Sequence, residues 1–275
     1  MTPVYLSTGA FTGRVNGRNP RLIVDYADRL DCDGFEFLYF PDFEDRLDEL
    51  IRLYVDAGLI IPVTHAEKKL GDYVSAPTDE AFGTACELLR KNANAAARLY
   101  PAGTPKLVAH CWGIPDSDSY IEQIIERVGI LRELAAEEGA ELYPENSFCV
   151  HGSPLEHFEA LALRYPELHF IVDTRCAQFH GELERFTASE VFRSRVRHLH
   201  INDYGGGYKD WNAMYPILQP PRGNVDWTSF FGALRELSYA GTITLEAPSM
   251  LPEGVDCKTL NEGLRFIRDG LAGNP

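Results

Sequence analysis

Short β-type runs and longer amphipathic segments alternate along this chain from end to end. The runs predict strands at Val4–Thr8, Gly34–Tyr39, Ile60–His65, Lys106–Cys111, Ala140–Glu145, His169–Asp173, Val196–Asn202 and Thr242–Glu246. Between them, apolar residues recur at helical spacing. This spacing predicts helices over about Pro20–Leu30, Asp42–Ala57, Asp79–Tyr100, Ser119–Glu138, Pro154–Tyr165, Glu182–Arg193, Asp226–Leu237 and Lys258–Leu271.

Residues at the expected helix boundaries agree with this pattern. Asp42, Asp226 and Ser153 are suited to capping helix N-termini. Gly58 and Gly139 follow predicted helices, where a left-handed residue ends a helix well. Eight strands alternating with eight helices predict an α/β fold, a (β/α)8 TIM barrel forming a single domain over residues 1–275. The alternative is a doubly wound sheet, but eight regular units favour closure.

The composition excludes two classes of partner. Of the 275 residues, 45% are hydrophobic and 24% charged, and no apolar run approaches the roughly 18 residues of a membrane span. The net charge of −15 argues against nucleic acid, because phosphate binding needs a basic stripe. The first residues do not form a signal peptide, and the six cysteines contain no CxxC pair. We expect a cytoplasmic protein with free thiols and no membrane partner.

Polar side chains end six successive predicted strands. They are His65, His110, Glu145, Asp173, His200 and Glu246. Because side chains alternate along a strand, Tyr143 shares a face with Glu145, and His198 shares a face with His200. In a barrel the C-terminal strand ends meet at one mouth, which is where active sites form. The six groups are therefore expected to converge.

Four of these residues predict a metal site. Three carboxylates placed together repel and raise one another's pKa values, and a divalent cation removes that repulsion. Glu145, Asp173, His200 and Glu246 would give the ion three oxygen donors and one imidazole. This donor set suits Mn²⁺, Mg²⁺ or Co²⁺, with Zn²⁺ and Fe²⁺ as alternatives. A metal-free polar network around a ligand is the competing interpretation.

The order of the strand-end motifs resembles that of the xylose isomerase-like TIM barrels. This family includes sugar isomerases and epimerases, inosose dehydratases and apurinic endonucleases. The matching motifs are Thr64-His65-Ala66, Ala109-His110, Pro144-Glu145-Asn146, Asp173-Thr174, His198-Leu199-His200-Ile201-Asn202-Asp203, Pro221-Arg222-Gly223-Asn224-Val225-Asp226-Trp227 and Thr244-Leu245-Glu246. Each motif is weak alone, but together they span nearly the whole chain.

The resemblance implies a metal-dependent isomerase or epimerase acting on a small-molecule carbohydrate, a sugar or sugar phosphate. Glu145 and Glu246 would then exchange a proton with the carbon next to a carbonyl, and the metal would stabilise the enediolate. Asp173 and His200 would mainly anchor the ion. Pure metal ligation is the alternative role for either glutamate.

Five further residues are candidates for contact with the substrate. His65 and His110 are expected to bind substrate oxygens or act as acids, with extra metal ligation as the alternative. Glu36 could reach a sugar hydroxyl or be a buried polar contact. Arg222 lies where these barrels often bind phosphate. Cys176 stands where the family usually carries a histidine, so it is either a soft metal ligand or, as we favour, a buried thiol.

His198 and the loop Gly205–Gly223 have different expected roles from the metal-site residues. His198 shares the face of His200 but lies deeper, which favours a packed core role. Gly205–Gly223 is expected to form a lid or substrate loop, within which Lys209 could join Arg222 in binding an anion. Gly205–Gly207 is more simply a flexible turn.

Three other functions stay open. A lyase could use the same groups to dehydrate a keto-polyol. A zinc phosphoesterase of the apurinic endonuclease type is disfavoured by the acidic balance, by Cys176 and by the lack of an Asp-x-His pair in Gly205–Gly223. A non-catalytic ligand-binding barrel is the third. The sequence is compatible with a homo-oligomer and does not specify one.

Overall fold

The computed structural model describes residues 2–113 and 118–274, in which eight parallel strands close into one barrel. Each strand pairs with the next in the sequence, and β8 returns to pair with β1. The strands are β1 (Val4–Ser7), β2 (Phe35–Leu38), β3 (Val63–His65), β4 (Lys106–His110), β5 (Glu141–Glu145), β6 (Phe170–Asp173), β7 (Val196–Ile201) and β8 (Thr242–Leu245). The predicted (β/α)8 barrel is confirmed.

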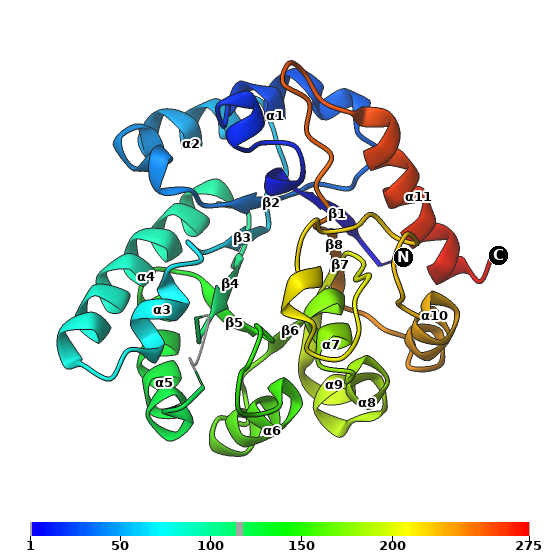
Figure 1. Cartoon of the computed structure of the whole chain (residues 1–275). Helices are drawn as coiled ribbons and strands as arrows, with labels where there is room; N and C mark the ends of the chain where they lie inside the picture. Colours follow the sequence, from blue (N-terminus) through cyan, green and yellow to red (C-terminus); the bar gives the residue numbers. More distant parts are fainter. Residues whose placement is uncertain (1, 114–117, 275) are drawn as a thin grey trace.

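The helices form a ring around the strands (Figure 1). They are α1 (Arg21–Tyr26), α2 (Leu47–Asp56), α3 (Leu70–Ser75), α4 (Asp79–Leu99), α5 (Ile121–Glu137), α6 (Pro154–Arg164), α7 (Thr174–Phe179), α8 (Leu183–Ala188), α9 (Glu190–Arg195), α10 (Trp227–Glu236) and α11 (Cys257–Ala272). Within residues 2–113 and 118–274 the short 3-10 helices are η1 (Thr8–Ala10), η2 (Arg14–Asn16), η3 (Ala27–Arg29), η4 (Pro41–Arg46) and η5 (Trp211–Ala213).

Most predicted boundaries are confirmed, and one cap is wrong. The side chain of Asp226 accepts a hydrogen bond from the amide of Ser229 at the start of α10, and Ser153 caps α6 in the same way. Gly58 and Gly139 have φ values of +69° and +86°. Asp42, in contrast, caps no helix, because it lies inside η4, which begins after Phe40.

Three helical segments differ from the prediction. α3 and α7 are single short helices in the loops that follow β3 and β6, and the sequence pattern did not predict them. The predicted helix Glu182–Arg193 is divided into α8 and α9 at Ser189, whose hydroxyl caps α9 by accepting from the amide of Phe192. Both short loop helices lie beside the polar strand ends and thereby shape the mouth.

Below its polar end the barrel interior contains both apolar and polar side chains. The apolar ones form a small buried cluster made of Tyr5, Val63, Val108, Tyr143 and Ile171. Four of these residues stand two positions before the polar residue at the end of their own strand. This is the alternation that the sequence predicted, and it directs His65, His110, Glu145 and Asp173 to the interior face. A much larger apolar core fills the space between strands and helices.

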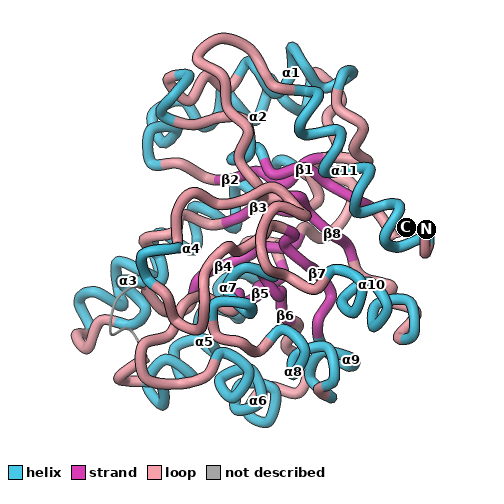
Figure 2. Tube along the Cα trace, turned by 45° about the vertical axis from the view of Figure 1, so that its right-hand side comes forward, coloured by secondary structure: helices cyan, strands magenta, loops and turns pink. Residues whose placement is uncertain are grey.

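Loops gather over the strands on one side of the barrel, as the tube view shows (Figure 2). One of them joins β7 to α10 and contains η5. Asp203 organises its ends, because its carboxylate accepts hydrogen bonds from the indole of Trp227 at 2.8 Å and from the amides of Tyr204 and Val225. The predicted loop Gly205–Gly223 therefore has a defined path.

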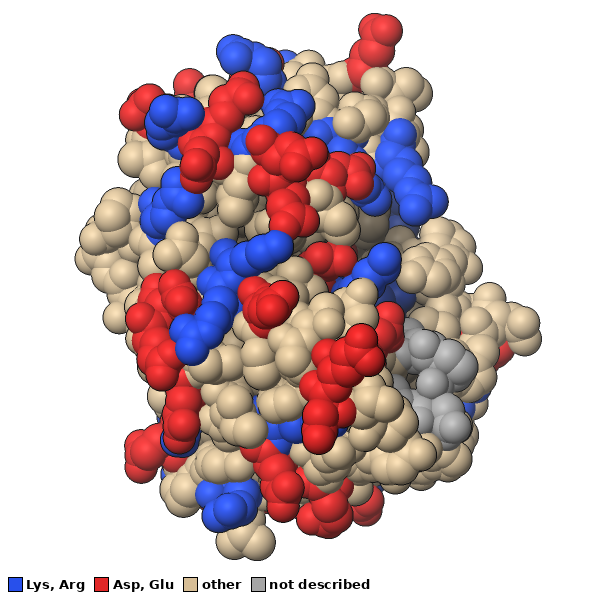
Figure 3. All heavy atoms as spheres, turned by 90° about the vertical axis from the view of Figure 1, so that its left-hand side faces the viewer, with Lys and Arg blue, Asp and Glu red and all other residues tan. Residues whose placement is uncertain are grey.

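The surface beside α2 and α4 mixes both signs of charge (Figure 3). Acidic and basic side chains pair across this face, as in Lys91 with Glu44, Arg98 with Asp48, and Arg90 with Glu137. This face shows none of the continuous basic stripe that nucleic-acid binding needs. Among the described residues, no helix is both long enough and apolar enough to span a membrane.

Candidate active site

Four acidic and imidazole side chains meet at the mouth of the barrel. Glu145 and Asp173 end β5 and β6, His200 lies near the end of β7, and Glu246 follows β8. Each offers one ligand atom, and these atoms lie within 4.8 Å of one another. All four residues are buried. Three carboxylates and one imidazole at this spacing are suited to holding a divalent cation.

His200 is the centre of the cluster. Its Nδ1 lies 2.9 Å from Oε1 of Glu145 and 3.3 Å from Oε2 of Glu246, while its Nε2 lies 2.8 Å from Oε1 of Glu36. Burial by itself would lower the pKa of His200, but attraction to the three carboxylates outweighs it and raises that pKa well above its usual value. In the protein without a metal, a protonated His200 therefore holds these carboxylates together.

Glu36 lies beneath His200 and is fully buried. One oxygen contacts His200 and the other lies 3.0 Å from Nε2 of His198. Both oxygens are thus engaged inside the protein, which favours an orienting role for Glu36 over the predicted contact with a sugar hydroxyl. A carboxylate that accepts Nε2–H of a histidine leaves Nδ1 directed at a cation, as is usual around metal-ligating histidines.

His198 belongs to the polar layer below the site. Its Nδ1 lies 2.6 Å from the hydroxyl of Thr242, and the hydroxyl of Thr244 is 3.1 Å from its Nε2. Burial lowers the pKa of His198 to about 4, against the opposing effect of Glu36. The imidazole is therefore a neutral, buried partner of Glu36, in agreement with its predicted core position.

Glu145 is bound by imidazoles on both of its oxygens. Its Oε2 lies 3.1 Å from Nε2 of His65 and 2.8 Å from Nε2 of His110, and its Oε1 contacts His200. Burial would raise the pKa of Glu145, but His110 and His200 hold it well below its usual value. His65, His110 and Glu145 are also close enough to hold an ion. The structure thus places the two predicted substrate-binding histidines against the predicted catalytic carboxylate.

Asp173 is held by the chain that follows it. Its Oδ1 accepts the amide hydrogen of Cys176 at 2.6 Å, which starts α7, and its Oδ2 accepts from Nδ2 of Asn202 at 2.9 Å. Asn146, the residue after Glu145, bonds to the backbone of Asp173 in both directions. These contacts fix the position of Asp173 beside Glu145.

The thiol of Cys176 packs in an apolar group. Its buried neighbours are Phe148, Phe179, Tyr204 and Met214. Burial raises the pKa of this thiol well above its usual value. The surroundings favour the buried-thiol interpretation of Cys176 over metal ligation, because a ligand must be a thiolate.

The ammonium group of Lys68 lies beside Glu246, and the sequence did not predict this contact. Nζ of Lys68 lies 3.5 Å from Oε1 of Glu246 and its side chain is half-exposed. Burial would raise the pKa of Glu246, but Lys68 and then His200 lower it to about 2. Lys68 comes three residues after His65, in the loop that follows β3. That position after a polar strand end is the signal by which the sequence could have identified it.

The two basic residues that were predicted to bind an anion, Arg222 and Lys209, have different surroundings. Nζ of Lys209 donates to the carbonyl of Val150 at 3.0 Å. Arg222 is exposed, and its guanidinium makes no contact with the cluster among the described residues. Trp112 is fully buried, and its indole donates to the carbonyl of Ser147.

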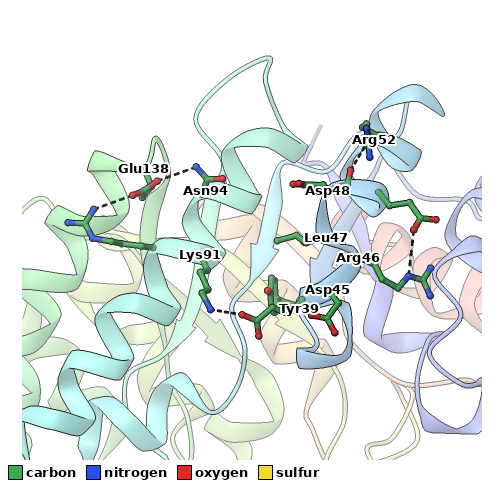
Figure 4. A pocket seen from close by; sticks show the side chains of 12 residues that line it. Tyr39, Asp45, Arg46, Leu47, Asp48, Arg52, Lys91, Asn94 and Glu138 are labelled. Carbon is green, nitrogen blue, oxygen red and sulfur yellow. Dashed lines mark hydrogen bonds and ion pairs between the residues drawn. The ribbon is translucent and has the colours of Figure 1, made fainter.

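A separate groove lies on the outside of the barrel, between η4 and α4 (Figure 4). Its volume is about 570 Å³, and charged side chains line it. These charges are paired with one another, as Lys91 is with Glu44 and Arg90 is with Glu138. The groove therefore has little unmatched charge to attract a ligand and is distinct from the mouth.

A closed barrel with a carboxylate and imidazole cluster at its mouth defines a class, that of TIM barrels with an acidic, cation-competent site. Within this class, the model of the family described as xylose isomerase-like TIM barrel matches residues 24–270. The chain belongs to this family, which confirms the resemblance drawn from the strand-end motifs.

Solved structures similar to this chain include several sugar epimerases. D-allulose 3-epimerase from Methylomonas sp. is 18% identical, with a TM-score of 0.71 and 98% of each chain covered. The 3-keto-D-glucoside 4-epimerase from E. coli is also 18% identical, with a TM-score of 0.70, covering 98% of this chain and 99% of the other. D-psicose 3-epimerase from Clostridium cellulolyticum H10 is 13% identical, with a TM-score of 0.65 and 98% of each chain covered. At these identities the likeness shows the fold. No curated protein sequence matches the chain.

Proposed function

We propose that this protein is a metal-dependent epimerase or isomerase of a small keto sugar, with Glu145 and Glu246 as the proton-exchanging pair. One observation carries the proposal. The two carboxylates approach the same atom, Nδ1 of His200, at 2.9 and 3.3 Å, within a cluster of four ligand-type groups. Two carboxylates held around one point can act on opposite faces of a substrate carbon, as inversion at that carbon requires.

The charge state of the pair suits this role. In the metal-free protein, His110 and His200 lower the pKa of Glu145, and Lys68 and His200 lower that of Glu246, so both carboxylates are ionised at neutral pH. A cation bound by the cluster would take the place of the proton on His200 and favour the same ionised forms. The ionised form accepts a proton from the carbon next to the carbonyl and leaves an enediolate. The second carboxyl group takes up a proton from solvent water and delivers it to the other face of the carbon, and the first then releases its proton to solvent. His65 and His110 hold Oε2 of Glu145 and thereby orient it.

The four-residue cluster fits a divalent cation, with Glu145, Asp173, His200 and Glu246 as its ligands. Their ligand atoms are already within 4.8 Å of one another, and Glu36 fixes the ring of His200 from behind. Such an ion supplies positive charge that offsets the carboxylates and stabilises negative charge developing on substrate oxygens. Mn²⁺, Mg²⁺ or Co²⁺ match the oxygen-rich set.

The names of the similar structures support a keto sugar as the substrate. Two of the enzymes above are 3-epimerases of ketoses, and another structure of the Methylomonas enzyme contains D-allulose. The likeness shows a shared fold, and the cluster at the mouth provides the chemical reason for extending the comparison. Fold alone does not fix a reaction.

Solvent deuterium exchange tests this proposal. Metal-loaded protein in D₂O should incorporate deuterium at the carbon next to the carbonyl of at least one member of a ketose panel, with formation of the epimer or isomer. Glu145→Gln and Glu246→Gln should each slow incorporation by about 10²- to 10⁴-fold, the usual contribution of a positioned acid or base. Glu262→Gln, on the exposed surface of α11, is the matched control.

Two results would contradict the proposal. Full exchange by both active-site variants would remove the glutamate pair from the mechanism. Loss of water from the sugar, in place of epimer formation, would reassign the same site to a lyase. Mass spectrometry of the products separates these outcomes in one experiment.

A further inference from the structure

A buried arginine borders the mouth and was not among the residues predicted from the sequence. Arg175 lies on α7, two residues after Asp173, and its exposed fraction is only 7%. Its guanidinium stacks 5.1 Å from the ring of Phe148 and 6.0 Å from that of Tyr215. Arginine is rarely buried unless its charge is paired. The partners of this guanidinium therefore decide what it does.

One edge of the guanidinium is left without protein partners. Nη1 donates to the carbonyl of Met214 at 3.0 Å. Nε is buried and has no hydrogen-bond partner among the described residues. The guanidinium's hydrogen bond to the described protein comes from Nη1, which leaves Nη2 also without a protein acceptor there. Nε and Nη2 are the two parallel donors with which arginine binds a carboxylate or phosphate in bidentate fashion. A buried donor without a partner costs about 1–3 kcal/mol, so an acceptor placed at Nε would stabilise this edge of the guanidinium.

The nearby acidic residue does not fill that role. Oδ1 of Asp173 accepts from the amide of Cys176 and Oδ2 from the side chain of Asn202, and neither oxygen is bonded to Arg175. Among the described residues Arg175 forms no ion pair, although the fields of Asp173 and Glu246 reach it and contribute to raising its pKa against the effect of burial. Its charge is thus close to the site and not neutralised by direct contact.

A second cation faces the same carboxylates. Lys68, from the loop after β3, lies 3.5 Å from Glu246, and its field and that of Arg175 act on each other. The two side chains come from opposite parts of the mouth, one after β3 and one after β6. A substrate lying over the cluster would therefore meet positive charge from both parts.

Resting on the proposed function, we infer that the substrate is an anionic keto sugar, whose carboxylate or phosphate is bound by Nε and Nη2 of Arg175, with Lys68 adding a second positive charge. The oxyanion would supply the acceptors that the buried edge lacks. Arg175 is then a specificity-determining residue that distinguishes charged from neutral sugars, while Glu145 and Glu246 act on the carbon.

A purely structural role predicts a different behaviour. If Arg175 only anchors the β7–α10 loop through the carbonyl of Met214, its loss would weaken charged and neutral ligands alike. If Nε and Nη2 bind an oxyanion, removal of the Arg175 side chain would weaken the binding of charged ligands and leave the affinity for neutral ligands unchanged. Matched ligands therefore separate the two roles.

Isothermal titration calorimetry on metal-loaded protein is the test. The ligands are D-fructose, D-tagatose and D-allulose, each as the neutral sugar, the 6-phosphate and the 6-carboxylate. At least one charged form should bind about 10-fold or more tightly than its neutral parent, and Arg175→Met should weaken that form about 10- to 100-fold. The neutral parent should change by less than about twofold. Comparison of the phosphate with the carboxylate identifies the oxyanion.

Two further variants control for misfolding and for a general effect of removing one positive charge. Arg175→Lys keeps a positive charge without the fork and should show part of the loss, even if Arg175→Met folds poorly. Arg265→Met, on the exposed face of α11, removes one charge far from the mouth and should leave every affinity unchanged. Thermal melting of each variant reports whether it is folded.

The outcomes separate this inference from the proposed function. Equal affinity for neutral and charged forms throughout, or an equal loss of both in Arg175→Met, would overturn the inference even if deuterium exchange occurs. Arg175-dependent binding of an anion without any exchange would overturn the proposed function instead. Calorimetry measures binding without turnover, so the anion-binding inference and the proposed epimerase activity are tested independently.

Discussion

Two clusters in this protein contain the same kinds of side chain and differ in what those side chains contact. At the mouth, Glu145, Asp173, His200 and Glu246 face one another. Beside α6, a second buried cluster is made of Asp118, Cys149 and His157. By residue type and spacing alone, both could hold a metal ion.

The hydrogen bonds distinguish the two clusters. Asp118 accepts backbone amide hydrogens from Val150, His151 and Gly152, and its carboxylate also contacts the ring of His157. Its lone pairs are used to hold the chain before α6. At the mouth Glu145 and Glu246 contact ionisable side chains, whose protons a cation can replace, and each oxygen of Asp173 accepts a single hydrogen bond from the described residues. A ligand set is therefore recognised by the lone pairs it leaves available, and residue type is not sufficient.

The largest expected effect comes from removing the central imidazole of the mouth. His200→Ala should weaken Mn²⁺ binding by more than about 100-fold, because loss of an outer-shell partner already costs 10- to 100-fold. It should also abolish isotope exchange. Titration of Mn²⁺ into the protein measures the change, with Asp118→Asn as the paired variant that keeps wild-type affinity. If His200→Ala and Asp118→Asn lost the same amount of Mn²⁺ affinity, the two clusters would not differ in metal binding.

An intermediate effect is expected beneath the mouth. Glu36→Gln keeps the shape of the side chain but removes the charge that holds Nε2 of His200. Metal affinity should fall about 10- to 100-fold, as for other outer-shell carboxylates, with the fold intact by circular dichroism. Full affinity in Glu36→Gln would argue that Glu36 only packs inside the barrel.

A smaller, structural effect is expected at the second cluster. Asp118→Asn should lower the free energy of unfolding by about 1–3 kcal/mol at neutral pH, because backbone amides lose a charged acceptor. Burial opposes ionisation of Asp118, but His157 and the three amides outweigh it and hold its pKa below the usual value. The stabilisation is thus present above the ordinary pKa of aspartate and disappears as the pH falls through the lower folded-state pKa.

Denaturant unfolding at a series of pH values measures this difference. The gap between wild-type protein and Asp118→Asn should be largest near neutrality and narrow only in strong acid. A gap that stays constant as the carboxylate is protonated would show that its charge contributes nothing to stability.

The sequence predicted what depends on periodicity and missed what depends on contacts between distant segments. Alternation along each strand was sufficient to direct Glu145, Asp173 and His200 to one mouth. The partners of Glu36 could not be predicted, because its contact with His200 joins positions 164 residues apart. Lys68 and Arg175 follow β3 and β6 in segments without a long periodic pattern, so the sequence places them after polar strand ends but does not show which carboxylates their charges act on.

Crystals soaked in Mn²⁺ and measured at an energy where manganese scatters anomalously would test the central claim most directly. We expect one strong peak enclosed by Glu145, Asp173, His200 and Glu246, and no peak beside Asp118, Cys149 and His157. An empty mouth in a crystal with open access to solvent, or manganese bound only at the second cluster, would contradict it.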